Sequence, residues 1–500
     1  MLPILSGVLV FFLKPAGPRR VLLLLTAVGH FLLTALAWVR QPAPSLGGWL
    51  LLDAPGLLFL SITSILFLMV AIYAIGYFQR EVWGQRQDFE EGLLFSNARE
   101  PTFTCCLLIF LSMMTLVTVS QHFGLLWVAI EATTLASAPM IYFHRHSRSL
   151  EATWKYIMIC SVGIALALLG NFFLAVASTV GEQEHVPMLI GSLVEQAPGL
   201  HVPWLKAAFL LFFVGYGTKM GLAPLHTWLP DAHSESPSLV SALLSGALLN
   251  CAFLGILRVQ QVTVAAGIGS YGRGLMLGFG LFSMLVAAAF IVGQTDFKRM
   301  LAYSSVEHMG ILSLAIGLGS ETGFGAMLHA VNHSLTKGML FLTAGNILAL
   351  YRSKSTTDIR GVARMLPVSG ALWVVGFLAI TGSPPFGTFL SELIILKSAI
   401  DQGRMAVAAC YLVLLCIIFI GMATIVLRMV QGKPAGLPAD VFQETADTRS
   451  SGNGPAPIAE SMWAVGPPLA LSAIILMLGI YIPPPLRHLL EQAAKAVGAG

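Results

Sequence analysis

The sequence predicts an all-α integral membrane protein with about fourteen transmembrane helices, in which two inverted five-helix repeats each contain a proline-broken helix. Three observations lead to this fold class: the composition, a series of long apolar segments, and two interrupted segments at matching positions. Of the 500 residues, 56% are hydrophobic and only 10% are charged, whereas about 25% of the residues of a soluble protein are charged. A surface so poor in charge is expected to face lipid.

Fourteen apolar segments are candidates for membrane spans, because a spanning helix needs about 20 mostly apolar residues. The first is shorter than the others. They lie near residues 2–14, 21–39, 54–78, 102–120, 122–142, 155–179, 204–228, 237–258, 274–294, 300–318, 322–350, 366–397, 405–430 and 461–483.

The loop charges predict the orientation of the chain. Of the 28 Lys and Arg residues, eighteen fall in loops on one side, eight fall on the other, and two lie inside helices. The positive-inside rule places the richer side in the cytoplasm. We therefore expect a multi-pass protein of a bacterial or archaeal inner membrane, with both termini outside.

Two long segments are interrupted in the middle. Residues 215–226 contain three glycines and Pro224, and residues 382–387 contain Gly382, Pro384, Pro385 and Gly387. Proline removes a helical hydrogen bond, and in a bilayer the freed backbone groups need protein or water partners. Broken helices at corresponding positions of two repeats indicate an ion site.

The layout of the spans divides the chain into four regions, with the broken helix fourth in each five-helix set. Because five is odd, the second set must be inverted relative to the first. The regions are an N-terminal three-helix segment (1–100), a first repeat forming a half-channel (101–260), a second repeat (261–430), and a loop with a C-terminal helix (431–500).

Glu131 and Lys219 are ionisable residues in the middle of predicted spans. Insertion of such a charge costs about 2.5–3.5 kcal/mol, so these side chains should pair or line water. We interpret them as a proton-carrying pair beside the break at Pro224. The alternatives are a Glu131 carboxyl satisfied by Thr133 or Thr134 and a Lys219 that extends to the membrane interface.

His329, His333 and Lys337 are spaced four residues apart and therefore share one face of a helix. Three titratable groups on one stripe favour a hydrated proton relay, since histidine changes charge near neutral pH. Two histidines at this spacing also suit zinc, but no third carboxylate or thiol is nearby in sequence. We therefore assign no metal site, and the remaining alternative is histidines satisfied by neighbouring helices.

Further polar residues extend this row. Glu392 follows the second break, and Asn250 lies within the eighth span, where it can bind a bridging water although it cannot titrate. The secondary candidates are His226, Glu307, His308 and Lys397. Glu307 and His308 either extend the path or anchor their helix, and Lys397 is placed to reach outward.

Several classes of function have no support in the sequence. A net charge of +4 is too small to indicate nucleic-acid binding, and none of the six cysteines has cluster-ligand spacing. We find no catalytic triad, P-loop or dinucleotide-binding motif. The chain is expected to hold no cofactor, and whether it belongs to an enzyme is left open.

Several motifs resemble those of the antiporter-like membrane subunits of respiratory complex I, membrane-bound hydrogenases and Mrp-type sodium/proton antiporters. They are KMGLAPLHTWLPDAH at 219–233, DFKRMLAYSS at 296–305 and HAVNHSLTK at 329–337. Within this family, DAHSESP at 231–237 and SALLSGALLNC at 241–251 are most similar to the F-type subunits of hydrogenase-4.

The resemblance implies a proton-translocating subunit, itself without a redox centre, in a redox-driven assembly with other membrane subunits. It implies that Glu131 and Lys219 form the ion pair of one half-channel, that the stripe from His329 to Lys337 lines a hydrated axis, and that Glu392 is the charged position of the second broken helix. Many members carry lysine where this chain has Asn250, so transfer here would rely on water or on the stripe.

Three alternative functions stay open. They are a subunit of an Mrp-type Na⁺/H⁺ antiporter without redox chemistry, a non-pumping scaffold, and a membrane partner for inorganic carbon uptake. Carboxylates, carbonyls and water suit both H⁺ and Na⁺, so the sequence leaves the transported ion open.

Overall fold

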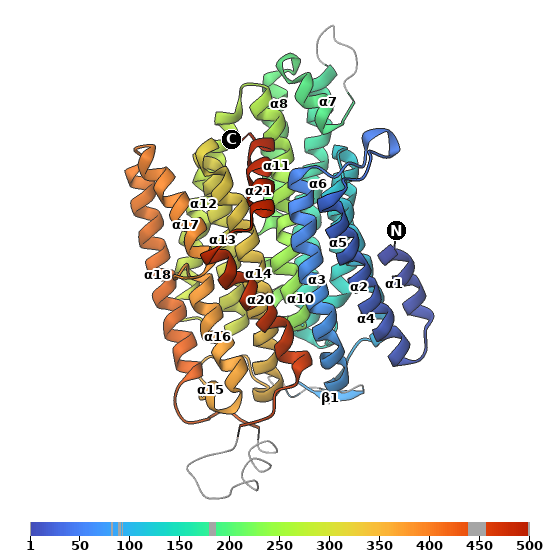
Figure 1. Cartoon of the computed structure of the whole chain (residues 1–500), viewed down its shortest axis with the longest axis vertical. Helices are drawn as coiled ribbons and strands as arrows, with labels where there is room; N and C mark the ends of the chain where they lie inside the picture. The colour runs from blue at the N-terminus through green and yellow to red at the C-terminus, as the bar shows by residue number, and fades with distance from the viewer. Residues whose placement is uncertain are drawn as a thin grey trace, which may run out of the picture.

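Helices run mainly along the long axis of the molecule, and the connections lie at its two ends (Figure 1). The computed structural model describes residues 2–81, 84–88, 92, 94–179, 187–438 and 457–498. Residues 439–456 of the predicted loop in the C-terminal region thus lie outside the described residues. The N-terminal region contains α1 (Leu2–Phe12), α2 (Ala16–Val39), η1 (Leu46–Gly48), α3 (Ala54–Arg80), and the short antiparallel strands β1 (Gln85–Gln87) and β2 (Leu94–Ser96).

The middle of the chain supplies most of the remaining helices. From residue 100 these are α4 (Glu100–Val119), α5 (Phe123–Ile141), α6 (Ser147–Thr179), α7 (Ile190–Glu195), η2 (Ala197–Gly199), α8 (Val202–Met220), α9 (Trp228–Glu235), α10 (Ser238–Leu243), the π-helix η3 (Leu244–Leu248) and α11 (Leu249–Ala265). They are followed by α12 (Gly269–Ile291), α13 (Phe297–Leu318), η4 (Ser320–Thr322), α14 (Gly323–Tyr351), α15 (Val362–Met365), α16 (Pro367–Ile380), α17 (Gly387–Asp401) and α18 (Met405–Val430). The last described helices are α20 (Met462–Ile480) and α21 (Pro484–Ala496).

The membrane character predicted from composition is confirmed, but the number of spans is only partly matched. Ten helical stretches in the described residues are long and apolar enough to cross a membrane. The other four predicted spans coincide with α1, α8, α14 and the α16–α17 segment, which are shorter or carry more polar residues. The total of fourteen crossings and the boundaries of the four regions therefore stay predictions.

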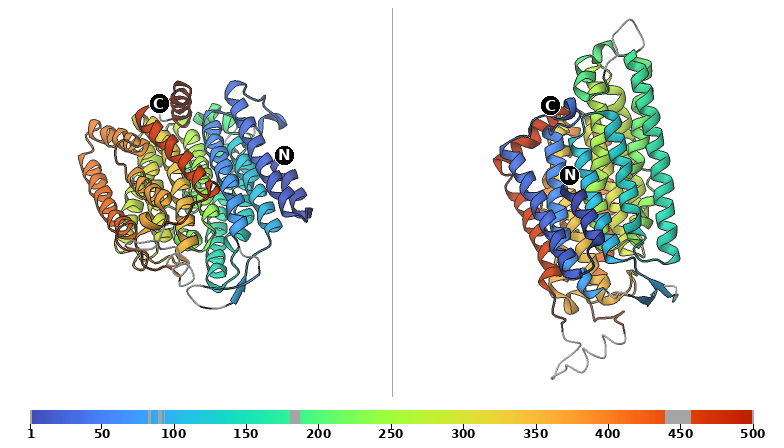
Figure 2. Two further views of the ribbon diagram at one scale, coloured as in Figure 1. Left: turned by 60° about the horizontal axis from the view of Figure 1, so that its bottom comes forward. Right: turned by 90° about the vertical axis from the view of Figure 1, so that its right-hand side faces the viewer.

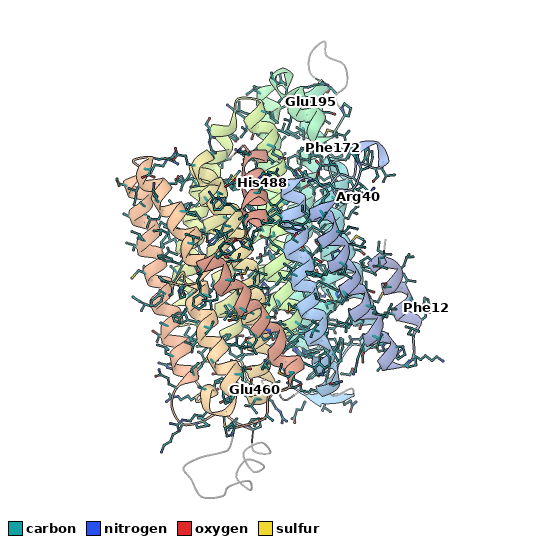
Figure 3. The ribbon with its side chains drawn as sticks, in the orientation of Figure 1. Phe12, Arg40, Phe172, Glu195, Glu460 and His488 are labelled. Atoms are coloured by element: carbon teal, nitrogen blue, oxygen red, sulfur yellow. The ribbon has the colours of Figure 1, made fainter. Side chains whose placement is uncertain are left out.

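The connections predicted to share one side of the membrane meet at one end of the molecule. Strand β1 and α15 lie at the lower end in Figure 1, whereas α7 lies at the upper end. In Figure 3, Arg40 and Glu195 are near the upper end and Glu460 is at the lower end. This separation agrees with the alternation of loops inferred from the basic residues.

The most buried helices lie at the centre of the bundle. Every residue in the apolar windows of α13 and of the α10–α11 stretch is buried, whereas α2, α12 and α18 expose apolar side chains. Helix α20 crosses obliquely over α14 and α3 and continues into α21 (Figures 1 and 2). Polar residues of α13 and α14 are therefore enclosed by protein, while the outer helices offer a surface suited to lipid or partner subunits.

Small residues let the central helices approach closely, as is common between helices in membranes. A Cβ atom on Gly215 of α8 would lie 2.6 Å from the carbonyl oxygen of Gly163 on α6. A Cβ atom on Gly280 of α12 would lie 2.7 Å from the carbonyl oxygen of Gly310 on α13. These contacts fix α8 and α13, the two helices that carry Lys219 and His308.

Both predicted helix breaks are present. Helix α8 ends at Met220, Gly221 adopts a left-handed conformation with φ of 84°, and the next helix, α9, begins at Trp228. Helix α16 ends at Ile380, Gly382 has φ of 63°, and α17 begins at Gly387. Glycine adopts such positive φ values without the steric penalty of other residues, which explains why each helix can end inside the apolar layer.

Candidate functional site

Lys219 lies in the last turn of α8, directly before the first break, and its side chain is completely buried. The C-terminal end of a helix carries a partial negative charge that favours a cation. The ammonium donates hydrogen bonds to Thr134 Oγ1 at 2.8 Å and to Tyr156 Oη at 2.6 Å. It also lies 4.4 Å from the centre of the Tyr156 ring, within the range of a cation–π contact.

Glu131 is joined to Lys219 through a hydroxyl instead of by direct contact. Thr134 Oγ1 donates to Glu131 Oε2 at 3.3 Å, and Ser161 Oγ donates to Glu131 Oε1 at 2.8 Å. Among the described residues, no ion pair within 4.0 Å links Glu131 to Lys219, and the two side chains are connected through the hydroxyl of Thr134. The chain of hydrogen bonds thus runs from the Lys219 ammonium through the Thr134 hydroxyl to the Glu131 carboxylate.

A second lysine occupies the centre of the bundle. Lys337 of α14 is completely buried and donates to the carbonyl oxygen of Leu301 at 2.6 Å and to the hydroxyl of Ser304. Both acceptors belong to α13, and the neighbouring Ser305 bonds Ser245 at 2.8 Å. The lysine expected to line the axis is thus held by the helix that also carries His308.

His308 joins the stripe formed by His329, His333 and Lys337. From the sequence alone, His308 could either extend the path or anchor its helix. His308 Nδ1 lies 2.9 Å from His329 Nε2, and the centroid of the His308 ring lies 5.1 Å from that of His333. Neither ring nitrogen of His333 has a hydrogen-bond partner in the part of the chain that the structure describes. The polar row therefore runs between α13 and α14 and is not confined to one helix face.

Glu392 reaches the same row from the second broken helix. Its carboxyl is buried, and Oε1 has no partner among the described residues. A Cβ atom on Gly382 would lie only 1.9 Å from Glu392 Oε2, so the carboxyl packs directly against the break. His308, His329 and Glu392 each place one potential metal-ligand atom within 4.8 Å of the other two.

Asn250 lies in α11, two residues after the π-helix η3. Its amide nitrogen donates to the carbonyl oxygen of Gly246 at 3.0 Å and to Ser334 Oγ at 2.6 Å, while Oδ1 is unpaired within the described chain. Short π-helical turns inside α-helices are frequent at functional sites. The bond from Asn250 to Ser334 thus connects α11 to α14, and Ser334 directly follows His333 in the sequence.

The secondary candidates separate into two groups. Glu307 is buried beside His308 on α13, and His226 is buried in the first break, with its ring centroid 6.1 Å from that of Tyr303. Lys397, in contrast, is 72% exposed and bonds Asp401 one turn away. Lys397 therefore lies outside the buried row, in agreement with the expectation that it reaches outward.

The sequence alone did not assign a role to the hydroxyl groups that connect these residues. Thr134 was considered only as an alternative partner of Glu131, and Tyr156, Ser161 and Ser391 were not singled out. Polar residues of this kind are common in membrane helices, so their presence alone carries little signal. Their positions become informative only when helices distant in sequence are brought together.

A cavity of about 470 Å³ opens at the basic end of the molecule. Charged residues from the ends of several helices and from one loop line it, including Arg80, Arg148, Glu235, Lys298 and Lys354. Burial alone would raise the pKa of Glu235. The charge and the hydrogen bond of Lys354, together with the charge of Arg148, instead hold this pKa below its ordinary value. Lys298 donates to the carbonyl oxygens of Ser234 at 3.0 Å and Ser236 at 2.6 Å, which places a buried ammonium on the wall of the cavity.

Comparison with known proteins identifies relatives that align with more than half of this chain. Over 329 residues the chain is 41% identical to a Hydrogenase-4 component F homolog of Methylacidiphilum infernorum, a match that covers 65% of this chain and 68% of the relative. It is 32% identical over 311 residues to Hydrogenase-4 component B of Escherichia coli, covering 60% of this chain and 45% of that protein. The chain thus spans less than half the length of the second relative.

Two solved structures share the fold over almost the whole chain. A subunit of an archaeal membrane-bound sulfane sulfur reductase has a TM-score of 0.83 at 20% identity, covering 99% of this chain and 96% of that subunit. A subunit of respiratory complex I from Thermus thermophilus has a TM-score of 0.78 at 23% identity, covering 99% and 98%.

A family model places the chain among these proteins. Residues 120–418, which include both broken helices and the buried row, match the model described as NADH:quinone oxidoreductase/Mrp antiporter, TM. The chain therefore belongs to this family of antiporter-like, multi-pass membrane subunits.

Proposed function

We propose that this chain is the proton-translocating subunit of a multi-subunit, redox-driven complex of the hydrogenase or complex I type. The names of the hydrogenase-4 relatives and the fold shared with complex I support this assignment. Other membrane subunits would pack against its exposed apolar helices, and the chain itself would contribute no redox centre. The charge of its loops supports an inner-membrane protein with both termini outside.

The observation that carries the proposal is the hydrogen-bonded chain from Lys219 through Thr134 to Glu131. A lysine in a dry interior stays charged only while nearby groups stabilise the ammonium. Displacement of Glu131 would remove part of that stabilisation, and the lysine would release its proton. A change in the electric field produced by a neighbouring redox module can act in this way, because a field moves the two opposite charges apart.

The second half of the path would use the row formed by Lys337, His333, His329, His308 and Glu392. Lys337 contacts α13, His308 connects α13 to α14, and Glu392 adds the broken helix α17. Asn250 would bridge the two halves by holding water on its unpaired Oδ1 while its amide nitrogen bonds Ser334, since an amide can both donate and accept hydrogen bonds. Asn250 therefore takes a transfer role without carrying charge.

Replacing Glu131 with glutamine tests the proposal. The substitution keeps the shape of the side chain but removes its charge, so redox-driven proton uptake into vesicles bearing the assembled complex should fall about 100-fold. Glu195→Gln is the control, because Glu195 is exposed in α7 far from the row. Unchanged uptake in the Glu131 variant, with the complex intact, would remove Glu131 from the mechanism.

Thr134→Val should slow proton uptake by about tenfold, the effect expected from losing one connecting hydrogen bond. Valine has the shape of threonine but cannot pass a proton between Lys219 and Glu131. Thr133→Val is the matched control, since within the described residues the hydroxyl of Thr133 bonds only the backbone carbonyl of Ile130. Equal rates in the two variants, measured with the same vesicle assay, would show that the Thr134 hydroxyl is not part of the path.

A further inference from the structure

Three helices bring two imidazoles and one carboxyl together in the interior of the protein. His308 comes from α13, His329 from α14 and Glu392 from α17, and all three side chains are buried. One potential ligand atom from each lies within 4.8 Å of the others. This group could not be expected from sequence spacing, because Glu392 is 63 residues after His329. The nearer histidine, His333, is not part of the group.

The cluster contains buried polar atoms that lack partners. Glu392 Oε1 and His308 Nε2 have no hydrogen bond within the described residues. Buried polar atoms are nearly always paired with protein, water or an ion, because leaving them unpaired costs free energy. An unpaired carboxylate oxygen beside two imidazoles indicates a place where a small polar species can bind.

The hydrogen bonds around His329 fix the nitrogen that faces the cluster. Ser391 Oγ donates its proton to the carbonyl oxygen of Thr388 at 2.8 Å. It must therefore accept the 3.0 Å bond from His329 Nδ1, which carries the ring proton. His329 Nε2 is consequently unprotonated and accepts the 2.9 Å hydrogen bond from His308 Nδ1, so a metal ion bound by both nitrogens would displace that proton. A hydrogen bond from the other ring nitrogen, here from His329 Nδ1 to Ser391, is what typically orients a metal-binding histidine.

The donor set indicates the class of ion. Two imidazole nitrogens and one carboxylate oxygen match zinc sites that keep an open coordination position, with bonds of about 2.0–2.2 Å. Calcium and magnesium prefer oxygen ligands and a larger coordination number. Ligand atoms around one zinc ion lie about 3.3 Å apart, so the atoms that now lie within 4.8 Å of one another would draw closer on binding.

We propose that His308, His329 and Glu392 form a binding site for one divalent transition-metal ion, for which zinc is the best fit. Its fourth position would be taken by water. The ion would occupy the same lone pairs that proton transfer requires. Bound zinc should therefore inhibit proton movement, a consequence that rests on the proposed function, whereas binding itself does not.

Cobalt binding to the full-length chain in detergent tests the site directly. Co²⁺ replaces zinc in such sites and gives a visible absorption spectrum that reports nitrogen and oxygen ligands in a four-coordinate geometry. We expect one Co²⁺ per chain with this spectrum, and its loss in His329→Gln and in Glu392→Gln. His30→Gln is the matched control, because His30 is also buried but bonds Ser64 and Thr115 through its two nitrogens.

A further variant keeps the test decisive if a ligand substitution impairs folding. Ser391→Ala leaves all three ligands in place but removes the partner of His329, so Co²⁺ affinity should fall about 10- to 100-fold with the spectrum retained. Absence of the four-coordinate spectrum in the unmodified chain would overturn the proposal. The proposal would also be overturned if the His329, Glu392 and Ser391 variants all bound Co²⁺ with the affinity of the unmodified chain.

Zinc titration of proton uptake by the intact complex separates this proposal from the proposed function. Inhibition that is reversed by a chelator and weakened in Ser391→Ala supports both. Site-specific cobalt binding without any zinc inhibition supports the metal site but contradicts the role of this cluster in proton transfer. Proton uptake that depends on Glu131, in a chain that binds no cobalt, supports the proposed function and overturns the metal site.

Discussion

Replacing Lys219 with methionine is expected to reduce redox-driven proton uptake about 100-fold or more. Methionine approximates the length and the apolar stem of lysine but cannot hold a proton. The substitution also leaves Thr134 and Tyr156 without the donor that joins them, so the chain to Glu131 is broken. Proton uptake into vesicles bearing the assembled complex, normalised to the electron-transfer rate, measures the effect.

Helix α8 offers a matched control for this substitution. Lys206 is on the same helix and also lies over a tyrosine ring, 5.6 Å from the centre of Tyr271, but it is exposed. Lys206→Met should change uptake by less than about twofold, as is usual for surface substitutions. If the Lys219 variant retains normal uptake, or if both variants lose it equally, the loss cannot be assigned to a buried proton carrier.

The difference between the two lysines is one of environment. An exposed ammonium stays hydrated whatever its neighbours do, so moving a nearby carboxylate hardly affects it. Lys219 depends on a few protein groups in a region without bulk water, where electrostatic interactions are stronger and less screened. This dependence is what allows a remote change of charge to alter the affinity of Lys219 for its proton.

The sequence predicted those parts of the site that are encoded locally. Gly221 and Pro224 indicated the first break, and Gly382 with the two following prolines indicated the second. Glu131 and Lys219 stood out because charged residues inside apolar segments are costly and rare. Such features depend on residue type and near neighbours, which a single sequence displays.

Features that depend on packing between distant segments could not be predicted in the same way. Thr134 is an ordinary helix residue in the sequence, and its connection becomes visible only because α8 places Lys219 beside it. The role of His308 was ambiguous in the sequence, and the structure places its Nδ1 atom 2.9 Å from His329 Nε2 on α14. The zinc alternative was set aside because no third ligand was close in sequence. The tertiary structure brings together a different set, in which His308 takes the place of His333 and Glu392 is the third potential ligand.

The helix count shows a related limit. Helix α14 has 29 residues, enough to cross a bilayer, but it falls outside the apolar spans because it carries the polar row. A functional helix enclosed by others need not be apolar on every face. A hydropathy criterion therefore misses α14, although it includes α13 and the α10–α11 stretch, which are fully buried and carry His308 and Asn250.

Replacing Gly382 with alanine is expected to reduce proton uptake by at least about tenfold without preventing assembly. The added Cβ atom would lie 1.9 Å from Glu392 Oε2, a distance that two atoms cannot keep, so the carboxyl must leave its position beside the break. Displacing a group by about 1 Å can cost about 100-fold where geometry controls the reaction. The effect should appear in proton uptake and, if the metal site exists, as weaker cobalt binding.

Gly403→Ala separates this displacement from simple backbone strain. Gly403 has φ of 69°, close to the 63° of Gly382, so alanine meets the same conformational penalty at both positions. No atom lies within 4 Å of a Cβ atom on Gly403, however, and Glu392 is not displaced. Normal uptake in the Gly403 variant with reduced uptake in the Gly382 variant would assign the effect to the Glu392 carboxyl. Equal losses would assign it to strain, and Glu392 would then have no demonstrated part in proton transfer.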